Sequence, residues 1–158
     1  MRFVPKFVPK QETCFREKEE KIKKYEEREF NKSQINEIEL GLEHNVDIRA
    51  YANLKFDNSQ MSQIRKGLEE GVDVDKYANP EFDYEQMQEI RWGLEAGLNV
   101  DKYANPEFNF YQMYQIRAGL EEDIDVDKYA DPKFDRNQMA EIRKELENKK
   151  QKEPEMEI

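Results

Sequence analysis

The chain has 158 residues, of which 39% are charged and 37% hydrophobic, and its formal net charge is −10. This length allows one domain, and the acidity argues against binding bare phosphate backbones, so we expect no direct nucleic-acid contact and a protein partner with a basic surface. The single cysteine, Cys14, cannot form an internal disulfide, no apolar run could span a bilayer and no secretory signal pattern occurs, which predicts a cytoplasmic protein without membrane contact.

The first 29 residues carry nine Lys and Arg against seven Glu, so the remainder holds a net charge of −12. Residues 1–10 contain the phrase Phe-Val-Pro-Lys twice. Because proline excludes a regular helix, we predict an extended basic arm there, which binds either the chain itself or a partner. In residues 11–29, Phe15, Ile22 and Tyr25 fall on one side of a highly charged helix, which we predict to cap the segment that follows.

From residue 30 onward, a block of 26 residues recurs without insertions. Self-similarity at a fixed period is the signature of a stacked repeat protein. We predict four complete copies and a truncated fifth over residues 30–147, followed by a flexible tail over residues 148–158. The copies begin at Phe30, Phe56, Phe82, Phe108 and Phe134.

The second copy illustrates the predicted long helix. Asp57 is a suitable N-cap, because its side chain can accept hydrogen bonds from the free amides of the first turn. Met61, Ile64 and Leu68 then fall on one helical face, and Gly71 can end the helix as a C-cap. Each copy therefore opens with an amphipathic helix of about three to four turns.

The second half of the copy is too short for another full helix. Asp73 or Asp75 can cap a single turn over residues 76–78, and Pro80 disfavours its continuation. No strand-like alternation competes. The predicted fold class is all-α, a right- or left-handed α-solenoid of short helix-turn-helix repeats, with one long helix and one single-turn helix per 26 residues.

Two residue types recur inside the long helix. Glycine is costly there, so we predict that it lets the next copy approach closely, and Glu145 replaces it in the last copy. The glutamines are predicted to form a ladder to neighbouring backbone, in preference to five identical ligand sites. The recurring residues are Gly41, Gly67, Gly93 and Gly119, and Gln34, Gln60, Gln86, Gln112 and Gln138.

An arginine column also recurs, and an aspartate stands ten residues after each arginine. In the first copy both signs are exchanged, with Glu39 and Arg49. A paired reversal predicts an ion pair within each copy, which leaves phosphate binding by the column as a minor alternative. The three pairs are Arg65 with Asp75, Arg91 with Asp101, and Arg117 with Asp127.

Little in the sequence suggests catalysis. The sole histidine, His44, has no counterpart in the other copies, and Cys14 has no neighbouring base in sequence. The phrase Asp73-Val74-Asp75 resembles the start of a calcium loop, but Ala78 and Tyr84 stand where that loop needs its glycine and glutamate. We therefore expect no enzymatic activity, no cofactor and no metal.

Positions that vary between copies, on the face opposite to the apolar stripe, are the natural recognition surface of a repeat protein. Large aromatic residues stand at these positions in copies three and four, where other copies hold Ser, Lys, Asn or Ala. Exposed aromatic rings are typical interface anchors, although the short helices or self-association are alternative ways to cover them. The predicted partner-binding residues are Trp92, Tyr111 and Tyr114, flanked by Tyr84 and Phe110 and by the acidic Glu95, Glu121 and Glu122.

The phrase Gln-Met-x-x-Ile-Arg-x-Gly-Leu-Glu-x-Gly-x-Asp-Val-x-x-Tyr-Ala-x-Pro-x-Phe runs from Gln60 to Phe82 and, with Asn in place of Asp, from Gln86 to Phe108. It resembles short helical repeats of uncharacterised proteins from bacterial mobile elements and phages. The likeness covers residues 30–147, and the first copy departs from it at Glu39, Arg49 and Leu54. The resemblance implies a bacterial host cell, where small acidic proteins often inhibit defence enzymes.

These observations predict a non-enzymatic repeat protein that binds another protein through its variable helix face. In its sharper form, the prediction is a phage or mobile-element inhibitor of a host defence nuclease, anti-CRISPR-like, that occupies the basic nucleic-acid channel of that enzyme. The alternative is an adaptor or a self-assembling structural protein, with the aromatic residues in a homotypic interface.

Overall fold

The computed structural model describes residues 10–153. These residues form helices and contain no strand, so the prediction of an all-α chain is confirmed. Six α-helices are joined by loops that contain four single-turn 3₁₀ helices. In chain order these are α1 (Lys10–Glu26), α2 (Lys32–Glu43), η1 (Ile48–Ala50), α3 (Asn58–Glu69), η2 (Val74–Lys76), α4 (Tyr84–Glu95), η3 (Val100–Lys102), α5 (Phe110–Glu121), η4 (Val126–Lys128) and α6 (Arg136–Lys152).

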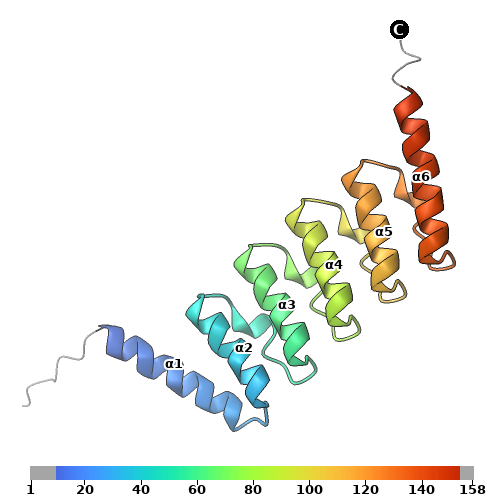
Figure 1. Ribbon diagram of the computed structural model, residues 1–158. Coiled ribbons are helices and arrows are strands. Elements are labelled where there is room, and N and C mark those ends of the chain that lie inside the picture. Colours follow the sequence, from blue (N-terminus) through green and yellow to red (C-terminus); the bar gives the residue numbers. More distant parts are fainter. Residues whose placement is uncertain (1–9, 154–158) are drawn as a thin grey trace, which may run out of the picture.

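The helices lie side by side in the order of the sequence, with α1 and α6 at opposite ends of the array (Figure 1). The main helix-to-helix contacts join consecutive helices, and each short helix from η1 to η4 contacts the long helix that precedes it. Such an arrangement brings together residues separated by about one copy in the sequence. No helix within residues 10–153 combines the length and the apolar character needed to cross a membrane.

Each copy begins its long helix with the same reciprocal cap. The predicted N-cap Asp83 accepts from the backbone N–H of Gln86 at 2.8 Å, and the side-chain oxygen of Gln86 accepts from the backbone N–H of Asp83 at 2.9 Å. This capping box satisfies two amides that would otherwise lack partners. The equivalent pairs are Asn31 with Gln34, Asp57 with Gln60, Asn109 with Gln112, and Asp135 with Gln138.

The glutamines also connect consecutive copies, so the predicted ladder to neighbouring backbone is confirmed for the four complete copies. The Nε2 of Gln86 donates to the carbonyl oxygen of Phe108 at 2.6 Å and to that of Pro106 at 3.2 Å. Gln34, Gln60 and Gln112 donate in the same way to the phenylalanine that opens the next copy, at 2.7 to 2.8 Å. The helix start and the position of the next copy therefore depend on one side chain.

The recurring glycines have a different role from the one we predicted. A Cβ atom placed on Gly93 would overlap the hydroxyl oxygen of Tyr103 and lie 2.8 Å from Val100 Cγ1. The tyrosine belongs to the same copy, and its hydroxyl donates to the carbonyl oxygen of Glu89 at 2.8 Å. The glycine thus admits the short helix of its own copy, not the next copy. Glu145 replaces it where no tyrosine follows ten residues later.

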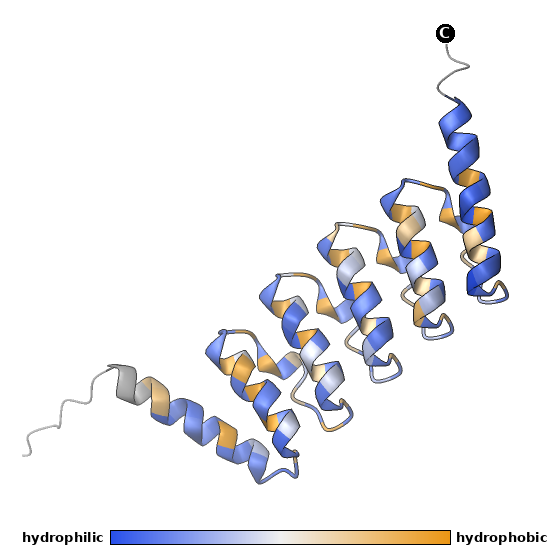
Figure 2. Cartoon of the chain, in the orientation of Figure 1, coloured by the Kyte–Doolittle hydropathy of each residue, from blue (hydrophilic) through white to orange (hydrophobic). Residues whose placement is uncertain are grey.

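The core repeats along the array. Met61, Ile64 and Tyr77 of the second copy have no exposed surface. The same is true of their equivalents in the third and fourth copies. Figure 2 shows hydrophobic residues in both the long and the short helix of each copy, whereas α1 is hydrophilic along most of its length. Among the side chains that the structure describes, those of residues 14–153, no buried nitrogen or oxygen lacks a hydrogen-bond partner. These buried rings and side chains stabilise contacts between copies.

The two ends differ in detail from the predicted boundaries. Helix α1 ends at Glu26 and not at residue 29, because the chain turns at Glu29, whose φ of 68° is left-handed. Tyr25 packs edge-on against Phe30, with ring centroids 5.4 Å apart, but Phe15 is 64% exposed and does not cap the first copy, contrary to our prediction. The predicted extended arm lies outside the described residues, except for Lys10, which begins α1.

At the other end, α6 continues past Asn148, where we predicted the tail to begin, and ends at Lys152. The Nζ of Lys150 donates to the carbonyl oxygens of Glu122 and Asp123 at 2.8 and 3.0 Å, which anchors the last turns of α6 on α5. The sequence did not indicate this contact, because it joins residues more than one copy apart. Residues 154–158 of the predicted tail lie outside the described part of the chain.

The glycine–tyrosine contact predicts the effect of Gly93→Ala. In an open helix this change would stabilise by about 1 kcal/mol, but here it should lower the free energy of unfolding by about 2 kcal/mol, because the Tyr103 hydroxyl occupies the space. Part of the loss should be recovered in a Tyr103→Phe background, measured by chemical denaturation as a double-mutant cycle. Glu145→Ala, at the equivalent position without a tyrosine, should change stability by less than about 0.5 kcal/mol. Equal costs at the two positions would contradict this assignment.

The glutamine contacts predict an unequal effect of the same substitution at two copies. Gln86→Ala removes the bonds to Phe108, Pro106 and the Asp83 amide and should cost about 2 to 3 kcal/mol of unfolding free energy. Gln138→Ala removes only the bond to the Asp135 amide among the described residues and should cost about 1 kcal/mol or less. Urea denaturation of both variants measures the difference.

Candidate protein interaction surface

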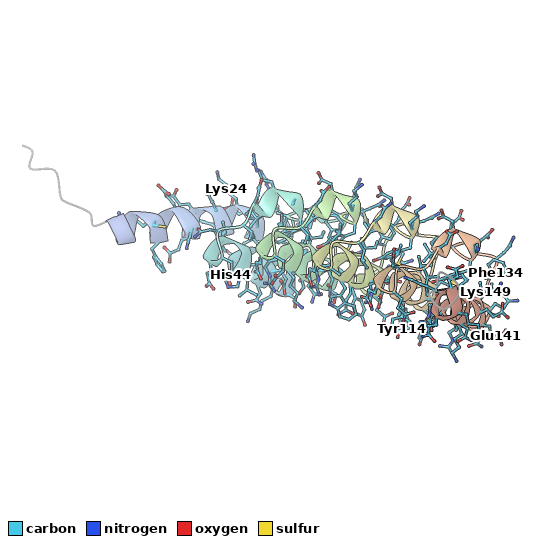
Figure 3. The ribbon with its side chains drawn as sticks, turned by 90° about the horizontal axis from the view of Figure 1, so that it is seen from above. Lys24, His44, Tyr114, Phe134, Glu141 and Lys149 are labelled. Atoms are coloured by element: carbon cyan, nitrogen blue, oxygen red, sulfur yellow. The ribbon has the colours of Figure 1, made fainter. Side chains whose placement is uncertain are left out.

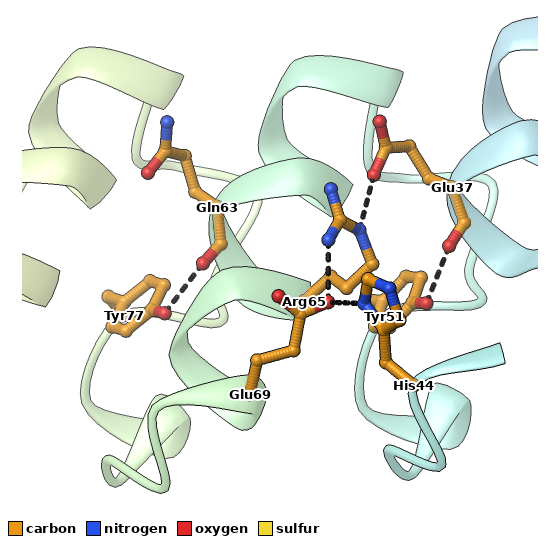
Figure 4. Close-up of polar contacts among 7 residues, drawn as sticks. All are labelled: Glu37, His44, Tyr51, Gln63, Arg65, Glu69 and Tyr77. Atoms are coloured by element: carbon orange, nitrogen blue, oxygen red, sulfur yellow. Dashed lines mark hydrogen bonds and ion pairs between the residues drawn. The ribbon is translucent and has the colours of Figure 1, made fainter. Parts of the chain in front are cut away.

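A column of arginines runs across the array, and its partners differ from those we predicted. Arg65 Nε donates to Glu37 in the preceding copy at 2.8 Å, and its NH1 donates to Glu69 on the same helix at 2.6 Å (Figure 4). The predicted partner Asp75 lies instead in η2, where its backbone amide donates to Asp73. The within-copy Arg–Asp pairing is therefore wrong, because the short helix turns Asp75 outward while helix packing brings Glu37 to Arg65.

The same geometry recurs at every junction. Each arginine donates through Nε to a Glu or Gln of the preceding copy and through NH1 to a Glu one turn later on its own helix. The preceding-copy acceptors alternate between glutamate and glutamine. The four sets are Arg65 with Glu37 and Glu69, Arg91 with Gln63 and Glu95, Arg117 with Glu89 and Glu121, and Arg143 with Gln115 and Glu147.

The predicted aromatic residues lie at the surface. We define the aromatic surface as Tyr84 and Trp92 on α4 together with Phe110, Tyr111 and Tyr114 on α5. The exposed fractions are 47% for Tyr84, 39% for Trp92 and 46% for both Tyr111 and Tyr114, whereas Phe110 is half-buried. The short helices of this chain therefore leave these four rings exposed, which excludes the intramolecular cover considered above for them.

Arg117 brings two of these rings together. Its guanidinium lies 5.4 Å from the ring centroid of Trp92 on α4 and 5.6 Å from that of Tyr114 on α5. The same guanidinium is held by Glu89 at 2.8 Å and by Glu121 at 2.5 Å. A cation in contact with both rings favours their fixed placement, and the ion pairs fix the cation. Tyr114 lies along the edge of the array formed by the long helices (Figure 3).

The other rings have contacts of their own. The guanidinium of Arg136, at the start of α6, lies 4.4 Å from the ring centroid of Tyr111. Phe110 and Tyr111 are adjacent in sequence, and their ring centroids are 3.9 Å apart. Tyr84 donates its hydroxyl to neighbouring Glu85 at 3.3 Å. Arg117 thus connects Trp92 with Tyr114, and Tyr111 packs against Phe110, whereas Tyr84 contacts Glu85.

The acidic residues of the predicted site are engaged within the chain. Glu95 pairs with Arg91, Glu121 with Arg117, and Glu122 lies 3.3 Å from Arg143 NH1. A hydrogen bond with the neighbouring carboxyl of Glu147 is the main reason that the pKa of Glu122 is raised. These carboxylates therefore order the arginine column. They remain exposed to solvent beside the aromatic rings, but part of their charge is offset by the arginines.

The sole histidine lies outside the aromatic surface. The Nδ1 of His44 lies 2.5 Å from Glu69, so the sole histidine extends the ion-pair network of Arg65 (Figure 4). Among the side chains of residues 14–153, no group of His, Cys, Asp and Glu is arranged to hold a metal ion. The sequence did not reveal the role of Arg117, but the distance of about one copy between Trp92 and Arg117 could have suggested it once adjacent helices were assumed to pack.

Comparisons with protein-family models, with curated proteins and with solved structures gave no match to this chain.

Burial of Glu89 generates a prediction about pH. Burial raises the pKa of Glu89 above its ordinary value, although Arg117 opposes the shift. A raised pKa in the folded state means that the contribution of Glu89 to stability falls as the pH rises through that value. Glu89→Gln should therefore be no less stable than the parent chain at neutral pH, as the native Gln63 and Gln115 at the same position suggest. Glu89→Ala, which leaves Arg117 Nε without its partner, should cost about 1 to 3 kcal/mol.

Chemical denaturation at pH 4.5 and pH 7 would measure these differences. The advantage of the Gln variant over the parent should grow from the lower to the higher pH, since only the parent ionises at this position. Glu81→Gln, in an exposed loop, is the matched control and should show no comparable change. A Gln variant that is destabilised most at pH 7 would contradict the prediction.

Proposed function

We propose that this chain is a non-enzymatic α-solenoid that binds another protein through the aromatic surface of α4 and α5. Support for the solenoid comes from four junctions that share the same glutamine and arginine contacts at the same sequence spacing. A stack of this kind presents one long-helix face to its surroundings. Residues on that face are free to vary between copies without disturbing the repeated contacts.

The exposure of Trp92, Tyr111 and Tyr114 carries the proposal. Other copies place Ser62, Lys66 or Asn137 at equivalent positions, so the fold itself does not require rings there. Large exposed aromatic side chains cluster at binding surfaces, and Trp and Tyr provide much of the binding energy in many interfaces. Two neighbouring helices supply the rings, which gives a surface broader than one helix.

The contacts of Arg117 hold two of these rings in place before a partner binds. Glu89 and Glu121 fix the guanidinium, and the guanidinium lies against Trp92 and Tyr114, so part of the ordering of both rings precedes association. A rigid anchor loses less conformational entropy when it binds. The surface is therefore favourable for a partner with an apolar pocket or groove of matching size.

Engagement of the acidic residues bears on the sharper hypothesis, an inhibitor of a defence nuclease from a phage or mobile element. Attraction to a basic nucleic-acid channel requires free carboxylates, and Glu95 and Glu121 are paired with arginines of this chain. The net charge of −10 can still steer a basic partner over longer distances. We propose that the aromatic rings supply most of the affinity and that charge affects mainly the association rate.

The test is affinity capture from bacterial lysate with the parent chain and with the triple variant Trp92→Ala, Tyr111→Ala and Tyr114→Ala. Each ring is exposed, so the variant should fold, which circular dichroism would check. Loss of a specific partner is expected, and a change of 2 kcal/mol or more, about thirtyfold in affinity, would mark these residues as anchors. Capture of the same partners at equal yield by both chains would contradict the proposal.

A matched control substitutes polar residues at the equivalent positions of another copy, Ser59→Ala, Ser62→Ala and Lys66→Ala on α3. This control should leave capture unchanged. Light scattering of the parent and of the triple aromatic variant distinguishes the alternative function. Oligomers that form in the parent and are lost in the variant would favour a homotypic aromatic interface.

A further inference from the structure

A groove lies between α1 and the first copy, on a different part of the molecule from the aromatic surface. Its volume is about 430 Å³. Figure 3 shows Lys24 on the edge of the array formed by the short helices, opposite to the edge that carries Tyr114. The residues that line it are Lys21, Lys24, Tyr25, Arg28, Leu42, Val46, Asp47, Ile48 and Arg49.

The rim of this groove is basic. Lys21 and Lys24 lie three residues apart on one face of α1, Arg28 lies in the turn that follows the helix, and all three line the same groove. All three are exposed, and among the side chains that the structure describes none of them forms an ion pair. The fourth cation, Arg49, is held by Asp47 through two bonds of 2.8 Å. Three positive charges therefore remain uncompensated on a chain that is acidic as a whole.

The floor of the groove is apolar. Leu42 and Val46 are partly buried, Ile48 is buried, and Tyr25 contributes its ring. A phosphate backbone would pair with the cations at the rim but has no apolar groups to pack against this floor. The groove instead fits a peptide that carries carboxylates along one edge and apolar side chains along the other.

The chain contains such a segment at its opposite end. Residues 153–158 read Glu-Pro-Glu-Met-Glu-Ile, a strict alternation of carboxylates with apolar side chains. In an extended peptide, alternate side chains point to opposite sides. Three carboxylates would then face one way, matching the number of uncompensated cations, and Pro154, Met156 and Ile158 the other. The basic arm before α1 offers no such match, because Arg2 and Lys6 carry the same sign as the rim.

We propose that residues 153–158 of one copy bind in the groove between α1 and the first repeat of a second copy. The same chain cannot supply both parts. Six extended residues span at most about 20 Å, whereas α1 and α6 are separated by five consecutive helix contacts of about 8 to 10 Å each and lie at opposite ends of the array (Figure 1). Because the two surfaces differ, the contact is head-to-tail and builds a chain or a ring of copies.

This contact goes beyond the proposed function and is compatible with it. The groove lies at the short-helix edge near the start of the array, so head-to-tail association leaves the aromatic surface of every copy accessible. An assembly of this kind would present several aromatic surfaces together, which raises the avidity for a partner that has repeated sites.

The test is the titration of a fluorescently labelled peptide of residues 148–158 with the full-length chain, followed by anisotropy at low salt. Saturable binding is expected. The double variant Lys21→Glu and Lys24→Glu should weaken it by about tenfold or more. A peptide with Glu155→Lys and Glu157→Lys should bind the parent poorly and regain affinity for the double variant. The matched control pair, Lys66→Glu with Lys144→Glu, makes the same charge change at exposed positions of α3 and α6 outside the groove and should bind like the parent.

Further variants test which segment occupies the groove. Met156→Ser and Ile158→Ser in the peptide should also weaken binding if the apolar floor contributes. Trp92→Ala with Tyr114→Ala in the chain should leave peptide binding unchanged, which separates this test from that of the aromatic surface. Light scattering should show association that increases with concentration and that the double lysine variant lacks.

Several results would overturn the proposal. One is equal peptide binding by the parent and by the Lys21→Glu, Lys24→Glu variant, and another is binding that does not saturate at millimolar chain concentration. A third is failure of the Glu155→Lys, Glu157→Lys peptide to regain affinity for that variant. Displacement of the labelled peptide by a single-stranded oligonucleotide at lower concentration than by unlabelled peptide would assign the groove to nucleic acid. Displacement by a peptide of residues 1–10 would assign it to the basic arm.

Discussion

The amide of one glutamine per copy is the interaction on which the rest of the structure depends. In Gln86 the oxygen accepts from the N-cap amide of its own helix, and the nitrogen donates to the phenylalanine carbonyl that opens the next copy. A single buried side chain thus sets both where a helix begins and where the next helix lies. Because the amide oxygen and nitrogen of Gln86 both have partners, a displacement of one copy relative to the next would leave buried polar groups without hydrogen bonds.

This fixed spacing explains why the same residues meet at every junction. Once consecutive helices are held in register, an arginine such as Arg117 reaches Glu89 of the preceding copy and Glu121 of its own helix. The arginines of this column are consequently largely buried, whereas exposed cations that form no ion pair among the described side chains lie, for example, at the rim beside α1. Register also places Trp92 and Tyr114, from different copies, near the same guanidinium, that of Arg117. The candidate site is therefore a product of the junction between α4 and α5.

Parts of the candidate site could be predicted and parts could not. The outward position of Trp92 and Tyr114 followed from helical periodicity, because that periodicity is local. The predicted partner of Arg65, Asp75, was wrong. The two residues are ten positions apart, and the chain between them bends in a direction that the sequence does not specify. Gly93 was correctly recognised as a packing residue, but its neighbour was assigned to the next copy when it is Tyr103 of the same copy. Both errors concern which surfaces meet across a turn.

The sequence by itself determined the all-α class, the repeat of 26 residues, the helix caps and the glutamine contacts with neighbouring backbone. These properties depend on short-range geometry and on the need to satisfy buried amides, and both can be recognised from residue type and spacing. Tertiary structure alone decided the arginine partners, the contact of the tyrosine hydroxyl with its glycine, and the groove between α1 and the first copy. Those features arise where separate helices meet, and their geometry depends on interaxial distance and orientation, which side-chain packing sets.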